Sequence, residues 1–134
     1  MRPRVLFDGS ADAMALVLAE PLSLWGGLDP QTGELTDVHH PQHGAQLSAR
    51  VVVMPSSRGS SSSSSILAEA VRAGHAPAAI VLGEPDLILA VGAAVAAELY
   101  DQHVPIVVLG LEDRDAIHDG MRVRIRNGGE ITLG

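Results

Sequence analysis

The chain has 134 residues, of which 46% are hydrophobic and 2% aromatic, so a single domain with a core of Val, Leu, Ile and Ala is expected over residues 1–134. The formal net charge of -7, the absence of lysine and the scattered arginines argue against nucleic-acid binding. Without cysteine, the chain has no disulfide and no thiolate for an iron–sulfur cluster. No apolar run approaches the length of a membrane span, and the N-terminus lacks the clean apolar core of a signal peptide. We therefore expect a cytoplasmic protein.

Short apolar runs alternate with helical patterns along the chain. Strands are predicted over residues 14–19, 50–55, 78–82, 104–109, 121–126 and 130–133, helices over 65–74 and 87–99, and one helical turn over 113–118. Gly74 is placed to end the first helix, and Asp86 to cap the start of the second. The second helix is apolar on nearly every side apart from Glu98, so we expect it to be largely buried.

The order strand, helix, strand, helix, strand predicts a parallel layer with crossover helices. The strands at each end of the chain predict an antiparallel part. The fold class is therefore expected to be α/β, a mixed β/β/α sandwich without internal repeats.

Residues 22–49 are rich in glycine, proline and polar residues and show no helical period, so they are predicted to form a long ordered loop. In this loop Trp25 is either a hydrophobic plug or part of a functional face. The histidines His39, His40 and His43 have a spacing that suggests metal binding, but no nearby pair of acids completes a site. Turn structure or contact with a partner is the favoured interpretation, and no metal site is expected in this chain.

The run Ser60–Ser65 follows Arg58 and Gly59 directly. Serine runs are commonly solvated linkers, but this one joins a strand to a helix of the same core. The carboxyl end of a parallel strand and the start of the next helix are where α/β proteins bind anions and substrates. Gly59 permits close approach of the backbone, serine hydroxyls and N–H groups suit a carboxylate or phosphate, and Arg58 adds a guanidinium. Glu84 follows the neighbouring strand and is expected either to sit in the turn that starts the helix or to point into the same cleft.

Several stretches together resemble the small subunit, or swivel domain, of the aconitase X family. These stretches are WGGLDPQTGELTD, HHPQHG, RGSSSSSSIL and APAAIVLGEPDLILAVGAAVAAELY, and the resemblance runs roughly from Gly9 onward. It implies a swivelling β/β/α domain. The family contains hydro-lyases that dehydrate cis-3-hydroxy-L-proline or mevalonate 5-phosphate. In both types a larger subunit or domain carries the iron–sulfur cluster, so the resemblance implies that this chain alone binds no cofactor.

The resemblance also implies roles for the serine loop. Iron in the partner would act as Lewis acid on the leaving hydroxyl, and a loop serine would take or give the proton. Ordinary aconitase uses a Gly-Ser-Ser-Arg loop whose first serine is the base. Gly59, Ser60 and Ser61 match its first three residues, but the arginine that should follow is missing and Arg58 precedes the glycine instead. We therefore predict Ser60, then Ser61, as catalytic, and Arg58, Gly59 and Ser62 as substrate-binding.

The later serines, Ser62–Ser65, are expected chiefly to donate backbone N–H groups, to cap the helix and to pack as small residues. A serine alkoxide needs positive potential, which Arg58, the loop N–H groups and the helix N-terminus could supply.

The function implied by the resemblance is the small subunit of a heteromeric dehydratase, active only with its large subunit and acting on a small hydroxy acid. A composition rich in Ala, Arg and Gly suggests a bacterial source and favours cis-3-hydroxy-L-proline, with mevalonate 5-phosphate as the alternative. The alternatives belong to two other functional classes. A phosphotransfer swivel domain requires a reactive histidine in its Gly/Ser loop, which is absent. A non-catalytic module that binds a small anion remains open. No nucleic-acid or membrane partner is expected.

Overall fold

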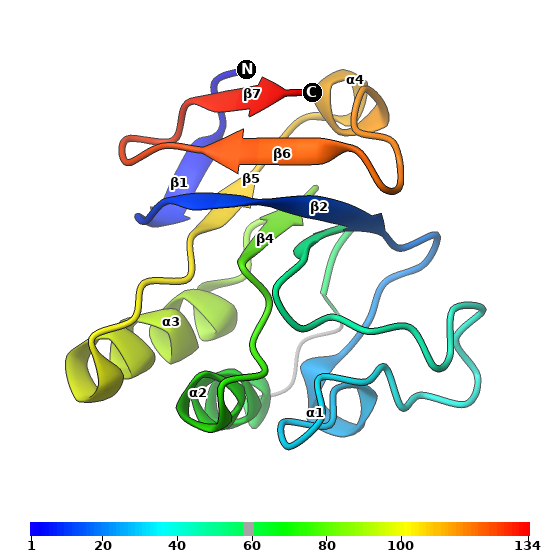
Figure 1. The fold of residues 1–134 in the computed structure, drawn as a ribbon, viewed down its shortest axis with the longest axis vertical. Coiled ribbons are helices and arrows are strands. Elements are labelled where there is room, and N and C mark those ends of the chain that lie inside the picture. The colour runs from blue at the N-terminus through cyan, green and yellow to red at the C-terminus, as the bar shows by residue number, and fades with distance from the viewer. Residues whose placement is uncertain (58–60) are drawn as a thin grey trace.

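The computed structural model describes residues 1–57 and 61–134, which form one mixed sheet flanked by helices (Figure 1). The predicted site residues Arg58, Gly59 and Ser60 lie outside the described residues. The elements in chain order are β1 Arg4–Phe7, β2 Ala11–Val17, α1 Leu24–Gly27, β3 Val51–Met54, α2 Ser63–Ala73, β4 Ala79–Leu82, α3 Leu87–Tyr100, β5 Ile106–Val108, α4 Leu111–Asp115, β6 Arg122–Ile125 and β7 Ile131–Leu133.

The described strands are ordered β1-β5-β4-β3-β2-β6-β7 in the sheet. The four central strands β2, β3, β4 and β5 are parallel, whereas β1, β6 and β7 pair antiparallel. Both the parallel layer with crossover helices and the antiparallel ends are as the sequence predicts, and the α/β fold class is confirmed. The carboxyl ends of the parallel strands therefore meet at one edge of the sheet.

The two faces of the parallel strands bury different side chains. On β3, Val52 and Met54 contact the core beneath the helices, while Val51 and Val53 contact a second core on the opposite face. This alternation follows from the two-residue period of a strand, and it explains why all four residues of β3 are apolar. Helices α1, α2 and α3 lie on one side of the parallel strands in Figure 1, and α4 and the curled end of the sheet with β6 and β7 lie on the other.

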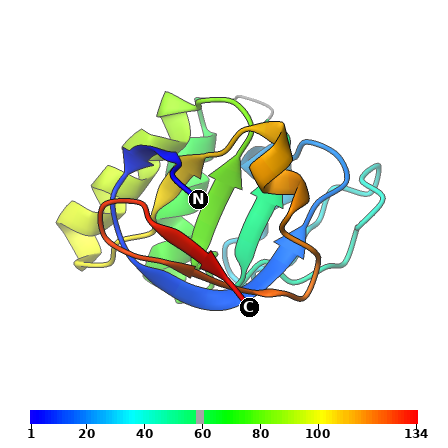
Figure 2. The same cartoon turned by 90° about the horizontal axis from the view of Figure 1, so that it is seen from above.

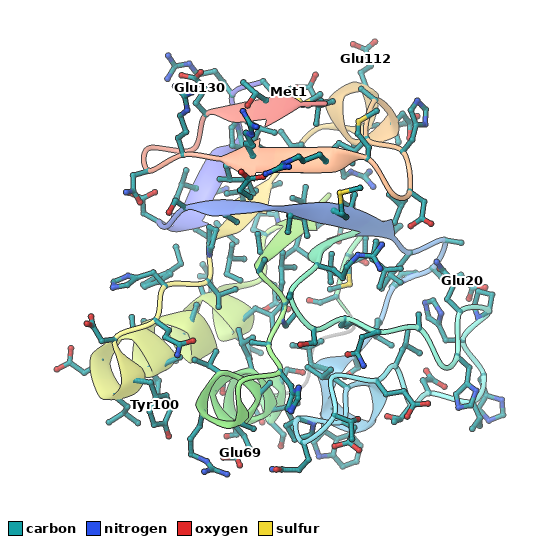
Figure 3. All side chains as sticks on the ribbon, in the orientation of Figure 1. Met1, Glu20, Glu69, Tyr100, Glu112 and Glu130 are labelled. Carbon is teal, nitrogen blue, oxygen red and sulfur yellow. The ribbon has the colours of Figure 1, made fainter. Side chains whose placement is uncertain are left out.

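The two ends of the sheet curl toward each other. The backbone N–H of Ile131 in β7 donates to the carbonyl of Met1 (3.3 Å), and Met1 lies beside β7 in Figure 3. A Cβ on Gly129, in the β6–β7 turn, would lie 2.5 Å from a methyl group of Val5 in β1. This curl, visible from above in Figure 2, encloses the second core.

Helices α2 and α3 pack closely enough to require glycine at their contact. A Cβ on Gly92 of α3 would lie 2.7 Å from the carbonyl oxygen and 2.9 Å from the Cα of Ser64 in the first turn of α2. The contact is between backbones, so no rotamer change could relieve it. It fixes the start of α2 against the middle of α3.

The expectation that α3 is largely buried is wrong. Leu89, Ala93 and Ala96 are buried, but Val91 and Leu99 on the opposite face are 56% and 64% exposed. One face of the helix packs on the sheet and α2, and the opposite face is exposed on the surface of the chain. The sequence does not mark the outward face, because apolar residues occupy both sides.

Other element predictions also differ from the structure. Residues 24–27, expected within a loop, form α1, and α2 begins at Ser63 instead of Ser65. Strand β1 was not predicted, and β2 covers Ala11–Val17 instead of 14–19. Helix α4 covers Leu111–Asp115 instead of 113–118. Among the described residues, no helix is long and apolar enough to cross a bilayer.

Candidate functional site

The candidate site lies where β3 and β4 end at the same edge of the sheet. Met54 and Leu82 are paired, so the segments that follow them leave the sheet side by side. Ser56 and Ser57 after β3, together with Glu84 to Ile88 after β4, line one open hollow of about 290 Å³. Glu84 lines this hollow with Ser56 and Ser57, which precede the serine run, so the alternative that Glu84 points into the cleft of the serine loop stays a prediction.

Asp86 joins the two segments that line the hollow. One of its carboxylate oxygens accepts the backbone N–H groups of Ile88 (2.9 Å) and Leu89 (3.2 Å), which confirms the predicted N-cap of α3. The other oxygen accepts a hydrogen bond from the hydroxyl of Ser57. A capping carboxylate thus also holds the segment that leads into the serine run.

The described serines of the run occupy the start of α2. Ser61 is exposed, and Ser62 occupies the N-cap position. Ser63 is buried, and the hydroxyl of Ser64 donates to the carbonyl of Ser61 (3.0 Å). The burial of Ser63 agrees with the packing role expected for the later serines, but among the described residues the side chain of Ser62 makes no capping hydrogen bond at the start of α2. The first turn of α2 contains no acidic residue, so its positive end is not neutralised there.

The long loop before β3 reaches the candidate site at its first residues. Leu22 forms an isolated parallel bridge with Ser57, and a Cβ on Gly27 would lie 2.7 Å from a methyl group of Leu22. Gln31 further along donates to Glu69 of α2 (3.1 Å). Trp25 is 59% exposed, so the interpretation as a hydrophobic plug is wrong. The loop is therefore ordered by backbone and leucine contacts, with its indole facing outward.

The histidines of this loop play structural or surface roles in the chain. His40 is buried, its Nδ1 accepts the N–H of Gln42 (3.0 Å), and its Nε2 contacts the carbonyl of Glu20 (3.1 Å). His39 and His43 are exposed. Across the part of the chain that the structure describes, no three His, Cys, Asp or Glu side chains are arranged to hold a metal ion.

Two residues near the site were not found by sequence reasoning. Ser57 precedes the run and was not distinguished from it, although it is the serine that bonds to Asp86. Arg114 on α4 lies against Gly83, the residue between β4 and Glu84. No local pattern marks Arg114, because its position depends on where the segment after β5 packs.

Comparison with known proteins places this architecture in a family. Residues 1–133 match the family described as the Aconitase X swivel domain. The cis-3-hydroxy-L-proline dehydratase of Pseudomonas aeruginosa is 49% identical over 108 residues, which are 81% of this chain and 19% of that protein. The chain thus spans about a fifth of that relative.

A second relative is similar in length to this chain. The phosphomevalonate dehydratase small subunit of Thermococcus gammatolerans is 33% identical over 134 residues, covering 99% of this chain and 96% of that one. The crystal structure of Thermococcus kodakaraensis aconitase X in its holo-form superposes with a TM-score of 0.86 at 30% identity, covering 99% of this chain and 96% of that chain. By sequence and by fold, the chain belongs to the aconitase X swivel-domain family, as its serine loop and flanking stretches indicate.

Proposed function

We propose that this chain is the small subunit of an aconitase-like dehydratase and that it supplies a serine acid/base to a site completed by a larger partner. The observation that carries the proposal is the edge of the sheet where the segments after β3 and β4 form one hollow at the start of α3, next to the segment that leads into the serine run. The names of the relatives, both dehydratases, support the reaction class.

The substrate that we propose is cis-3-hydroxy-L-proline. The dehydratase named for it is 49% identical to this chain, whereas the phosphomevalonate dehydratase small subunit is 33% identical. Mevalonate 5-phosphate is the alternative substrate, because this chain and the phosphomevalonate dehydratase small subunit match over nearly their full lengths. Both substrates are hydroxy acids, so the same chemistry at the serine loop serves either one.

In the proposed reaction a serine of the loop, Ser60 or Ser61, removes a proton from the carbon next to the one that bears the hydroxyl. The electron pair of that C–H bond forms the C=C bond, and the C–O bond breaks as its pair leaves with hydroxide. The serine must start as an alkoxide, which the N-terminal end of α2 and the guanidinium of Arg58 would stabilise. The substrate would also contact Gly59 and Ser62.

We further propose that the iron–sulfur cluster belongs to the partner. The chain has no cysteine, so it has no thiolate with which to hold a cluster, and the described histidines and carboxylates form no metal-binding group. The chain's own contribution is therefore limited to binding the substrate and moving the proton.

The experiment is anaerobic co-expression with the large-subunit protein, followed by assays of both substrates in parallel. Ser60→Ala and Ser61→Ala are compared with Ser65→Ala, a matched control because Ser65 is exposed in the first turn of α2. Loss of a positioned acid/base lowers kcat by about 10²- to 10⁴-fold, and we expect that loss in one of the first two variants only. Full activity in both would contradict the proposed serine role, and two chains that do not associate would favour a module that only binds an anion.

A further inference from the structure

Arg114 lies at the same edge of the sheet as the candidate site. It belongs to α4, which follows β5, and its side chain is partly buried. Together with Leu111 and Asp115 it lines a second open hollow of about 260 Å³, whose other walls are the ends of two parallel strands. Those walls are formed by Val17, Leu18 and Ala19 at the end of β2 and by Val53, Met54 and Pro55 at the end of β3.

The guanidinium of Arg114 packs on the backbone between the two hollows. A Cβ on Gly83 would lie 2.7 Å from Cζ and 2.8 Å from Nη2 of Arg114, and 2.4 Å from the carbonyl oxygen of Pro55. Pro55 precedes Ser56, and Gly83 precedes Glu84, so each is followed directly by a residue that lines the first hollow. Only a residue without a side chain at position 83 leaves room for the guanidinium there.

Arg114 forms no salt bridge in the described part of the chain, although Asp115 lines the same hollow. Its Nε is buried and has no hydrogen-bond partner among the described residues. Other arginines are paired: Arg72 with Glu69, and Arg122 with Asp12. A buried N–H without a partner costs free energy, and such groups in native structures call for an explanation. Because Nε is shielded from solvent, a ligand in the hollow would reach the part of Arg114 that lines it.

We propose that Arg114 binds the carboxylate of the hydroxy-acid substrate at this edge of the sheet. The inference rests on the proposed function, and it names the group that this chain uses to hold the substrate. A guanidinium donates two parallel N–H···O hydrogen bonds to one carboxylate, which fixes the orientation of the substrate as well as its position. Bound there, the substrate lies next to the segments that lead into the serine run and into α3.

The test measures steady-state kinetics of the complex with Arg114→Gln and Arg114→Lys, with Arg126→Gln as control because Arg126 is exposed beyond β6. We expect KM to rise about 10- to 100-fold in Arg114→Gln with kcat changed much less, and a smaller rise in Arg114→Lys, which keeps the charge but not the planar pair of donors. The control should match the wild type.

L-Proline provides a second readout, since it carries the carboxylate but has no hydroxyl to lose. It should inhibit the wild-type complex competitively and L-prolinamide should not, and Arg114→Gln should weaken inhibition by L-proline by the same factor as it raises KM. Unchanged KM and inhibition would overturn the proposal. Weaker association of the subunits with unchanged KM would also overturn it, because Arg114 would then pair with a carboxylate of the partner.

A failure of the proposed function can be told apart from a failure of this inference. If the wild-type complex dehydrates neither substrate, the function is wrong, and the role of Arg114 is decided by NMR on the chain alone. A saturable shift of the Arg114 Nε–Hε signal with L-proline, absent with L-prolinamide, would support carboxylate binding. No shift would overturn it.

Discussion

The hydroxyl of Ser57 donates a hydrogen bond to the carboxylate of Asp86, which also caps the start of α3. The segment that leads into the serine run is therefore anchored by the residue that begins the next crossover helix. The two segments that line the candidate site cannot separate without breaking this bond or the cap.

Asp86→Ala should destabilise the chain by about 1–2 kcal/mol, because the first turn of α3 loses its cap. Asp86→Asn keeps an oxygen that can cap the helix, so it should lower the free energy of unfolding by less. Ser57→Ala removes only the bond between the segments. Urea unfolding of the three variants measures the free energy of unfolding, and equal losses in Asp86→Ala and Asp86→Asn would show that the carboxylate oxygen does not act as a cap.

Gly92→Ala should destabilise the chain by about 1–3 kcal/mol, because the added Cβ would lie 2.7 Å from the carbonyl oxygen of Ser64 and push α2 and α3 apart. The matched control is Gly110→Ala. Gly110 has an ordinary φ of −66°, and a Cβ there meets nothing within 4 Å. Thermal unfolding of both variants tests the contact, and similar melting temperatures would contradict it.

Leu89→Ala and Leu99→Ala change the same residue type on the same helix, yet their effects should differ. Leu89 is fully buried, so its truncation should cost about 2–5 kcal/mol, whereas Leu99 is 64% exposed and should cost under about 1 kcal/mol. Denaturant unfolding of the chain alone measures both. A comparable loss in the two variants would mean that α3 is covered on both faces.

The salt bridge between β2 and β6 should make stability depend on acid pH. Hydrogen bonds from Arg122, with its charge and that of Arg124, hold the pKa of Asp12 below its ordinary value of 3.8. Because the pKa is depressed in the folded chain, this stabilisation is present above about pH 4 and is lost as the pH falls through the folded pKa.

The measurement for this pair compares the wild type with Asp12→Asn in urea between neutral and acid pH. The difference in free energy of unfolding should shrink below about pH 4, and it should also be smaller in about 1 M salt, because the pair is exposed. A difference that stays constant with pH would show that Asp12 titrates alike in the folded and unfolded chain.

The parallel core was predictable from sequence because its signals are local. The apolar runs that became β3, β4 and β5, the glycine that ends α2 and the acid that caps α3 each act over a few residues. The shared hollow after β3 and β4 followed from topology, since the carboxyl ends of neighbouring parallel strands must meet.

The remaining features depend on packing between distant segments. β1 is short and pairs with β5 across most of the chain, so no turn next to it announces a strand. The outward face of α3 could not be assigned because Val91 and Leu99 are as apolar as the buried residues of the helix. Arg114 reaches the site only because α4 folds back over Gly83.

The contact of Met1 and Val5 with the β6–β7 hairpin has a consequence for association between molecules. β1 and β7 are the outer strands of the sheet, and such strands offer unpaired backbone groups to which another chain can add. Here the first residues of the chain lie along β7, where the carbonyl of Met1 accepts a hydrogen bond from the N–H of Ile131. The two outer strands of the sheet therefore shield each other. Shortening the N-terminus by three residues should therefore leave the monomer folded but promote its self-assembly through β7.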